Sequence, residues 1–156
     1  MPSTSTPQTK PAQPPPIFCL LAYAATIAAR HAERELRPHG LTVRQFGLLM
    51  QLRQEPALTM AELARQIGVS RQSLQEMTAE LERAGHLRRA PGMSGRTRRL
   101  ELTSRTERAV YYAQAALLEA EAEFLGGGLT PHEIETLRTL LRRLLAYATD
   151  DEAWLP

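Results

Sequence analysis

The chain has 156 residues, of which 43% are apolar, so it is long and apolar enough for one domain with a hydrophobic core. Aromatic residues make up only 5%, and most apolar positions are Ala or Leu, which favours a mainly helical fold. The formal net charge of +2 is too small to indicate a polyanionic partner, and the single Cys19 excludes an internal disulfide or a cysteine-based zinc site. No stretch resembles a membrane span or a signal peptide, so we expect a cytoplasmic protein without a membrane partner.

The first sixteen residues carry mainly Pro, Ser, Thr and Gln, with no large apolar side chain after the first residue. Such a segment cannot offset the entropy lost on ordering, which predicts a disordered arm over 1–16. A helix is predicted over 17–37, because this stretch holds no Gly or Pro and Pro38 follows it. A second helix is predicted over 43–54, before Pro56.

Two short helices joined by the turn "GVS" are predicted in the middle of the chain. The first begins at "TMAE", where Thr59 and Glu62 have the spacing of a capping box. The second is capped by Ser70 and ends at Gly85. Its predicted inward face consists of Leu74, Met77, Thr78 and Leu81. This arrangement is typical of a helix-turn-helix.

A β-hairpin is predicted next, with strands "HLRRA" and "TRRLELT" around the turn "PGMSGR". Between residues 86 and 108 there are seven arginines and two glutamates, a local excess of five positive charges. Guanidinium groups suit both phosphates and base edges. The hairpin is therefore a candidate DNA-contacting wing beside the helix-turn-helix.

Two long helices are predicted to complete the chain, over 104–125 and from Pro131 to about residue 148. The first is predicted to be capped by Ser104, and the second by Thr130 with Glu133. The first carries apolar residues every three or four positions, namely Val110, Ala113, Leu117, Ala120 and Phe124. The apolar faces of these two helices need a surface to pack against. We therefore expect the long helices to pack on each other and on a second subunit. A short acidic tail is predicted over 150–156.

Residues 17–149 resemble the MarR family of transcriptional regulators. The resemblance rests on the stretches "LTVRQFGLLMQL", "LTMAELARQIGVSRQSLQEMTAELERAGHLRR" and "LELT", in the family's order and spacing. It implies a mainly α fold with a small β-hairpin wing, in which a winged helix-turn-helix over 57–103 is flanked by dimerisation helices over 17–54 and 104–148. It also implies a homodimer that represses at an operator until a small molecule or an oxidant releases it.

The outward face of the predicted recognition helix holds the candidate DNA-binding residues. These are Ser70, Arg71, Gln72, Ser73, Gln75 and Glu76. Gln pairs with adenine, Arg with guanine and Glu with cytosine in the major groove, while Ser70 and the helix N-terminus suit a phosphate. In the wing, Arg96 is predicted to enter the minor groove and Arg98 and Arg99 to contact phosphates. The alternative is that these polar side chains form an ordinary solvated surface without a DNA partner. The wing also departs from the family, because it has Ser-Gly-Arg where the family usually has Asp-Arg-Arg.

Cys19 and Tyr23, one turn apart in "FCLLAY", resemble the organic-hydroperoxide-sensing branch of the same family. The second tyrosine of that pattern falls on Glu33. Peroxide chemistry needs a thiolate, which a helix N-terminus or a cation favours. The alternative is that Cys19 is a small hydrophobe in the interior.

The four histidines show no metal-ligand spacing, and we expect all of them to be surface or capping residues without a metal or cofactor. No nucleophile motif, phosphate loop or carboxylate pair indicates an enzyme. The sequence therefore predicts a DNA-binding regulator, most simply a repressor released from a pseudo-palindromic operator by a small aromatic or phenolic ligand. Two alternatives remain, a peroxide-sensing repressor that uses Cys19 and a winged-helix module that binds proteins instead of DNA.

Overall fold

The computed structural model of the protein describes residues 13–92 and 98–150. The elements in chain order are α1 (Ile17–Leu36), a 3₁₀ turn (Arg37–His39), α2 (Val43–Gln54), α3 (Met60–Gln66), α4 (Arg71–Arg83), β1 (Leu87–Pro91), β2 (Arg98–Leu102), α5 (Ser104–Gly126) and α6 (Pro131–Thr149). These bounds confirm every predicted helix and both predicted strands to within one or two residues. Most of the predicted arm, the hairpin turn over 93–97 and the tail after residue 150 lie outside the described residues.

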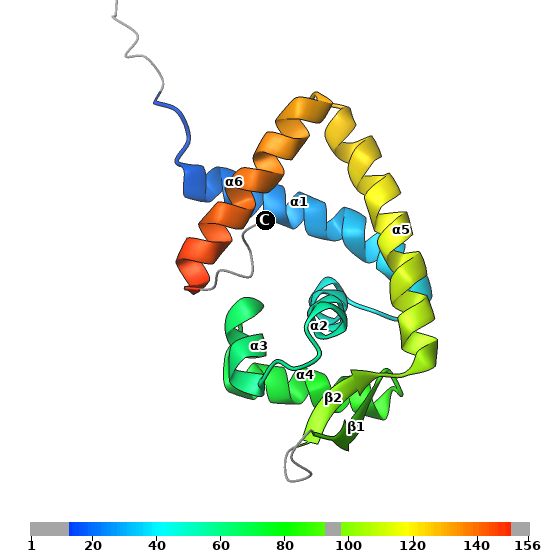
Figure 1. Cartoon of the computed structure of the whole chain (residues 1–156). Helices are drawn as coiled ribbons and strands as arrows, with labels where there is room; N and C mark the ends of the chain where they lie inside the picture. Colours follow the sequence, from blue (N-terminus) through cyan, green and yellow to red (C-terminus); the bar gives the residue numbers. More distant parts are fainter. Residues whose placement is uncertain (1–12, 93–97, 151–156) are drawn as a thin grey trace, which may run out of the picture.

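The molecule has two parts, which Figure 1 shows one above the other. In the lower part, α2, α3 and α4 pack with the hairpin of β1 and β2. In the upper part, α5 and α6 meet at the top and α1 crosses below their junction. The long helix α5 joins the two parts, because it begins directly after β2 and runs up to α6.

The two strands pair antiparallel, with Leu87 opposite Leu102 and Arg89 opposite Leu100. In β2, Leu100 is buried and Arg99 is exposed, as the alternation of apolar and charged residues predicts. The hairpin therefore places one apolar face on the helices and its arginines at the surface.

Side-chain caps fix most of the helix starts. The predicted capping boxes of Thr59 with Glu62 and of Thr130 with Glu133 are both present. The predicted cap of α5 by Ser104 is wrong, because the cap is Thr103, whose hydroxyl accepts from the Thr106 amide. The same Thr103 hydroxyl donates to the Gly85 carbonyl at 2.9 Å, so it also ties α5 to the end of α4.

One hydrophobic core lies in the lower part of the molecule. Its buried residues are Leu36, Leu41, Leu48, Leu49, Leu52, Leu63, Ala64, Leu74, Leu81, Leu87, Leu100, Val110 and Ala113. Helices α2, α3 and α4 supply most of them, while α1 and α5 contribute only the ends nearest the winged helix. Helix α6 buries no residue at all.

Large apolar side chains of the upper part are instead exposed. They include Ile17, Phe18, Leu20, Tyr23 and Ile27 on α1, and Leu140, Leu141, Leu144, Leu145 and Tyr147 on α6. Only the first half of the predicted α5 seam is buried, at Val110 and Ala113, whereas Phe124 at its far end is exposed. Across residues 13–92 and 98–150, no helix combines the length and apolarity that a membrane span requires.

Candidate nucleic-acid interface and ligand cavity

Helix α4 is held by its inward face and offers its outward face to solvent. Leu74, Thr78 and Leu81 are buried, as predicted, and Met77 is partly buried against the same core. Before the helix, Gly68 has a φ of +68°, a left-handed conformation that L side chains rarely adopt, and this allows the sharp turn between α3 and α4. The turn therefore sets the direction in which the outward face of α4 points.

All the candidate DNA-binding residues of α4 are exposed. They are Ser70, Arg71, Gln72, Ser73, Gln75 and Glu76. The Ser70 hydroxyl accepts from the Ser73 amide at 3.1 Å and donates to the Ser73 hydroxyl at 2.9 Å, which makes Ser70 the helix cap. Gln72 donates to Glu76 at 3.3 Å, so these two outward side chains hold each other one turn apart. Within the described residues no ion pair involves Arg71, whose charge is open to an outside partner.

Ion pairs engage the described arginines of the hairpin. Glu101 contacts both Arg88, at 3.1 Å, and Arg99, and Glu82 of α4 contacts Arg89 at 2.8 Å. The arginine side chains of these pairs are 48 to 68% exposed and the glutamates 20 to 27% exposed. Ion pairs that water reaches in this way contribute about 0 to 1 kcal/mol, so phosphates can compete for the arginines. Of the other predicted wing residues, Arg96 lies outside the described residues, and only the backbone of Arg98 is described, opposite Pro91.

His86 corrects the expectation that every histidine is a surface or capping residue. Its side chain is buried where α4, β1 and α5 meet, and its Nδ1 lies 3.0 Å from the Thr106 hydroxyl. Since Thr103 donates to the Gly85 carbonyl, Thr106 must donate to Thr103 and accept from His86, which puts the imidazole hydrogen on Nδ1. Burial first, and the nearby Arg105 second, lower the pKa of His86 below its ordinary value.

Sequence reasoning missed His86 because no periodicity marks a residue in the link between a helix and a strand. Its neighbours held the only signal, since Thr103 and Thr106 are two hydroxyl residues at the spacing of a helix cap. Of the other histidines, His31 packs against Phe124 with ring centroids 4.5 Å apart, and His132 is exposed. In the described part of the chain, no cluster of His, Cys, Asp or Glu could hold a metal ion.

Cys19 and Tyr23 lie on the first turns of α1, as the sequence predicts. Within the single chain Cys19 is partly exposed and Tyr23 is 65% exposed. The backbone amide of Cys19 donates to Pro16 at the start of the helix.

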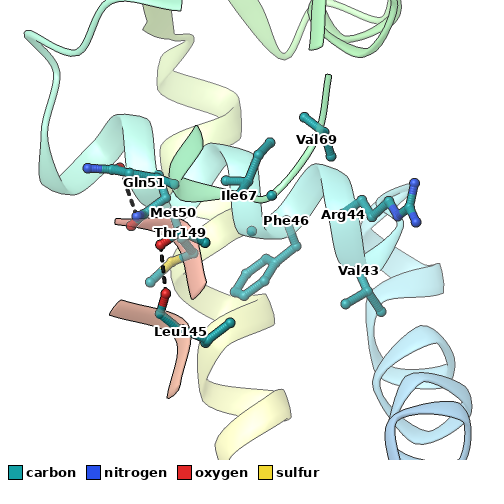
Figure 2. A pocket seen from close by; sticks show the side chains of 12 residues that line it. Val43, Arg44, Phe46, Met50, Gln51, Ile67, Val69, Leu145 and Thr149 are labelled. Carbon is teal, nitrogen blue, oxygen red and sulfur yellow. Dashed lines mark hydrogen bonds between the residues drawn. The ribbon is translucent and has the colours of Figure 1, made fainter. Parts of the chain in front are cut away.

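Two cavities lie beside the winged helix and the long helices. One, of about 410 Å³, lies between α2, the α3–α4 turn and the C-terminal end of α6, and Figure 2 shows it with Phe46, Met50, Ile67 and Leu145 around it. The other is an apolar groove of about 580 Å³ between α1, α5 and α6, with Leu21, Leu117 and Leu141 among its lining residues. The first cavity contacts both parts of the molecule, whereas the second belongs to the upper part alone.

Known proteins resemble this chain in both sequence and fold. A model of the MarR family matches residues 39–99. The HTH-type transcriptional repressor Rv2887 of Mycobacterium tuberculosis is 32% identical over 126 residues, which span 80% of this chain and 91% of that protein. The crystal structure of Rv2887 with p-aminosalicylic acid matches with a TM-score of 0.67 at 31% identity, over 83% of this chain and 98% of that one. Sco3205, a regulator from Streptomyces coelicolor crystallised with DNA, matches with a TM-score of 0.71 at 26% identity, over 85% and 88% of the two chains.

Proposed function

The chain belongs to the MarR family of winged-helix transcriptional regulators, and from this premise we propose a specific role for it. It is a repressor that binds a pseudo-palindromic operator as a homodimer and leaves the DNA when a small aromatic or phenolic molecule binds. Members of this family are DNA-binding proteins and not enzymes. The observation that carries the proposal is the outward face of α4, which is polar, exposed and adjacent to a hairpin rich in arginine.

The proposed division of labour follows the two parts of the molecule. Helix α4 enters the major groove, where Arg71, Gln72, Gln75 and Glu76 meet base edges and Ser70 with Ser73 lies near a phosphate. The wing residues Arg96, Arg98 and Arg99 contact the adjacent minor groove and backbone. We place the protein in the cytoplasm, where chromosomal DNA is the partner of these residues. The single cysteine fits this location, because a chain without an internal disulfide needs no oxidising compartment.

The exposed apolar faces of α1 and α6 support the proposed homodimer. A monomer rarely leaves so many large apolar side chains in water on neighbouring helices. A second subunit covers them and sets the separation of the two α4 helices, which must match half-sites about one helical turn apart. The proposed scaffold therefore comprises α1, α5 and α6. Helix α2, which the sequence predicts to belong to the scaffold over 17–54, contributes to the core of the winged helix instead, so the proposed reading unit is α2 together with residues 57–103.

The cavity between α2, the α3–α4 turn and α6 supports regulation by a small ligand. It borders the turn that orients α4 on one side and a helix of the dimer scaffold on the other. The two parts take one arrangement when the protein is bound to DNA. A ligand that binds more tightly to a different arrangement of the two parts shifts the protein population toward the DNA-free state. Rv2887, a relative of this chain, has been crystallised with p-aminosalicylic acid and with salicylic acid.

A second candidate input is oxidation of Cys19, which lies in the first turn of α1, one helical turn before Tyr23. Treatment with an organic hydroperoxide decides between the two inputs. Release of DNA from the wild type but not from Cys19→Ser supports sensing by Cys19. Equal behaviour of both proteins eliminates it.

The central experiment selects bound fragments from the source genome and measures their affinity by fluorescence anisotropy. The salt dependence of binding reports the number of phosphate contacts, so Arg96→Ala with Arg98→Ala lowers the slope by about two. An unchanged slope contradicts the role of the wing. Absence of a salt-sensitive shift with any duplex, random DNA included, contradicts DNA binding and favours a protein-interaction module.

A further inference from the structure

The cavity between α2, the α3–α4 turn and α6 has apolar walls and a polar floor. The walls are Val43, Phe46, Met50, Ile67, Val69 and Leu145. The floor consists of two side-chain amides, Gln51 of α2 and Gln66 of α3, with the Gln51 nitrogen donating to the Gln66 oxygen at 3.0 Å. Gln66 is only 4% exposed.

Only one nitrogen and one oxygen of the amide pair on the floor take part in a hydrogen bond in the described part of the chain. Within the described residues, the Gln66 nitrogen and the Gln51 side-chain oxygen have no further hydrogen-bond partner. Even if both amides were turned over, the pair would still leave one NH₂ group and one carbonyl oxygen free. An unpaired polar group this deeply buried is unfavourable, so the floor is complementary to a ligand that offers one acceptor beside one donor.

Gly47 shows that the space above this floor is left open at the expense of helix stability. It lies inside α2 and lines the cavity, although glycine is a poor residue for a helix interior. A Cβ atom built on Gly47 meets no atom within 4 Å. A Cβ at this position therefore enters open space, and a longer side chain is expected to extend into the cavity.

Charge distinguishes a neutral ligand from an anionic one. Arg44 is the only cationic side chain among the described residues that line the cavity. Figure 2 shows its guanidinium pointing away from Met50 and Leu145. A carboxylate on the floor would face the free carbonyl oxygen with no cation beside it, which is unfavourable.

We infer that this cavity binds a planar aromatic molecule that carries a neutral carboxamide or lactam edge, and that this edge pairs with Gln51 and Gln66. The carbonyl of the ligand accepts from the Gln66 nitrogen, and its N–H donates to the Gln51 oxygen. The inference rests on the proposed function, since it names the chemical class of the regulatory ligand. It also identifies the coupling, because the ligand contacts Gly68 and Val69, directly before the cap of α4, and Leu145 of the dimer scaffold.

Calorimetric titration of the full-length protein with salicylamide and with salicylate tests the inference, since the two probes differ only in amide against carboxylate. Salicylamide is expected to bind at least about tenfold more tightly than salicylate. Gln66→Leu lowers the affinity for salicylamide by about tenfold and leaves that for salicylate within about twofold. The matched control Gln54→Leu, at an exposed glutamine of the same helix α2 as Gln51, changes neither affinity.

A second variant, Gly47→Leu, keeps the test independent of any folding defect in Gln66→Leu. It is expected to retain the melting temperature and to lower salicylamide binding by at least about tenfold by filling the cavity. Equal affinities for the two probes, no binding of either at millimolar concentration, or unchanged binding in Gly47→Leu overturns the inference. Operator release is measured separately by anisotropy. Salicylamide binding with the expected variant pattern but without DNA release supports the site and contradicts ligand-relieved repression.

Discussion

Helices α4 and α6 carry similar amphipathic patterns, yet the apolar face of α4 is buried and that of α6 is exposed. In α4, Leu74 and Leu81 are 0% and 1% exposed, because they lie in the core of the winged helix, where α3 and β1 pack on α4. In α6, Leu140 and Leu144 are 53% and 47% exposed, and no residue of the helix is buried. An apolar stripe thus indicates that a helix packs, but not whether the partner belongs to the same chain. The difference separates a self-sufficient reading unit from a scaffold that requires a second copy.

The largest expected effect comes from breaking the scaffold. Leu144→Glu places a charge in the middle of the exposed α6 stripe, which prevents its burial against a second subunit. We expect a monomer at micromolar concentration and a loss of operator affinity of about 100-fold or more, because two half-sites no longer act together. Sedimentation velocity and anisotropy measure both quantities. Thr139→Glu, on the opposite side of the same helix, is the control, and a dimer that survives Leu144→Glu contradicts the assignment of this face.

Breaking the reading unit has a smaller and more selective effect. Gln75→Ala removes an exposed side chain of α4 that has no described side-chain hydrogen bond. Loss of a base contact costs about 1 to 3 kcal/mol for the operator, while binding to random DNA stays the same. Fluorescence anisotropy with an operator duplex and a random duplex gives the ratio of the two affinities for the wild type and the variant. If the two affinities fall together, Gln75 contributes no sequence reading.

The contrast between the two parts also shows what the sequence could predict. Capping signals and turn glycines are local, so the boundaries of the helices, including the Thr59 and Thr130 caps, followed from residues a few positions apart. The exposed face of α4 followed from its helical periodicity in the same way. The resemblance to a family then supplied the roles of these elements.

Features that depend on the meeting of distant segments could not be predicted. The cap of α5 is Thr103 and not Ser104, because the Thr103 hydroxyl also reaches Gly85, eighteen residues earlier. The burial of His86 depends on the same junction. The amide pair of Gln51 and Gln66 joins two helices whose residues look like ordinary surface polar positions in the sequence. Each of these is a tertiary contact between side chains without a periodic pattern.

The junction between the two parts is expected to respond to pH. Because the pKa of His86 is lowered in the folded protein, the unfolded chain binds more protons below the ordinary value of 6.5. The free energy of unfolding is therefore highest above pH 6.5 and falls as the pH drops through 6.5 toward the lowered pKa. Urea denaturation between pH 8 and pH 5 measures this slope. His86→Gln reduces it and His132→Gln, at an exposed position, leaves it unchanged; equal slopes in all three proteins rule out His86 as its source.

The smallest expected effect concerns the hairpin, where the structure shows arginines already paired. Glu101→Gln removes the carboxylate shared by Arg88 and Arg99. Pairs whose arginine side chains are exposed to water, as Arg88 and Arg99 are, contribute little, so the free energy of unfolding changes by less than about 1 kcal/mol. Both guanidinium groups become free for phosphates, so random duplex DNA binds a few times more tightly, with a salt slope steeper by about one. Glu123→Gln, which makes the same change of charge far along α5, controls for net charge. If Glu123→Gln steepens the slope equally, the gain comes from overall charge, and the hairpin makes no direct backbone contact through these arginines.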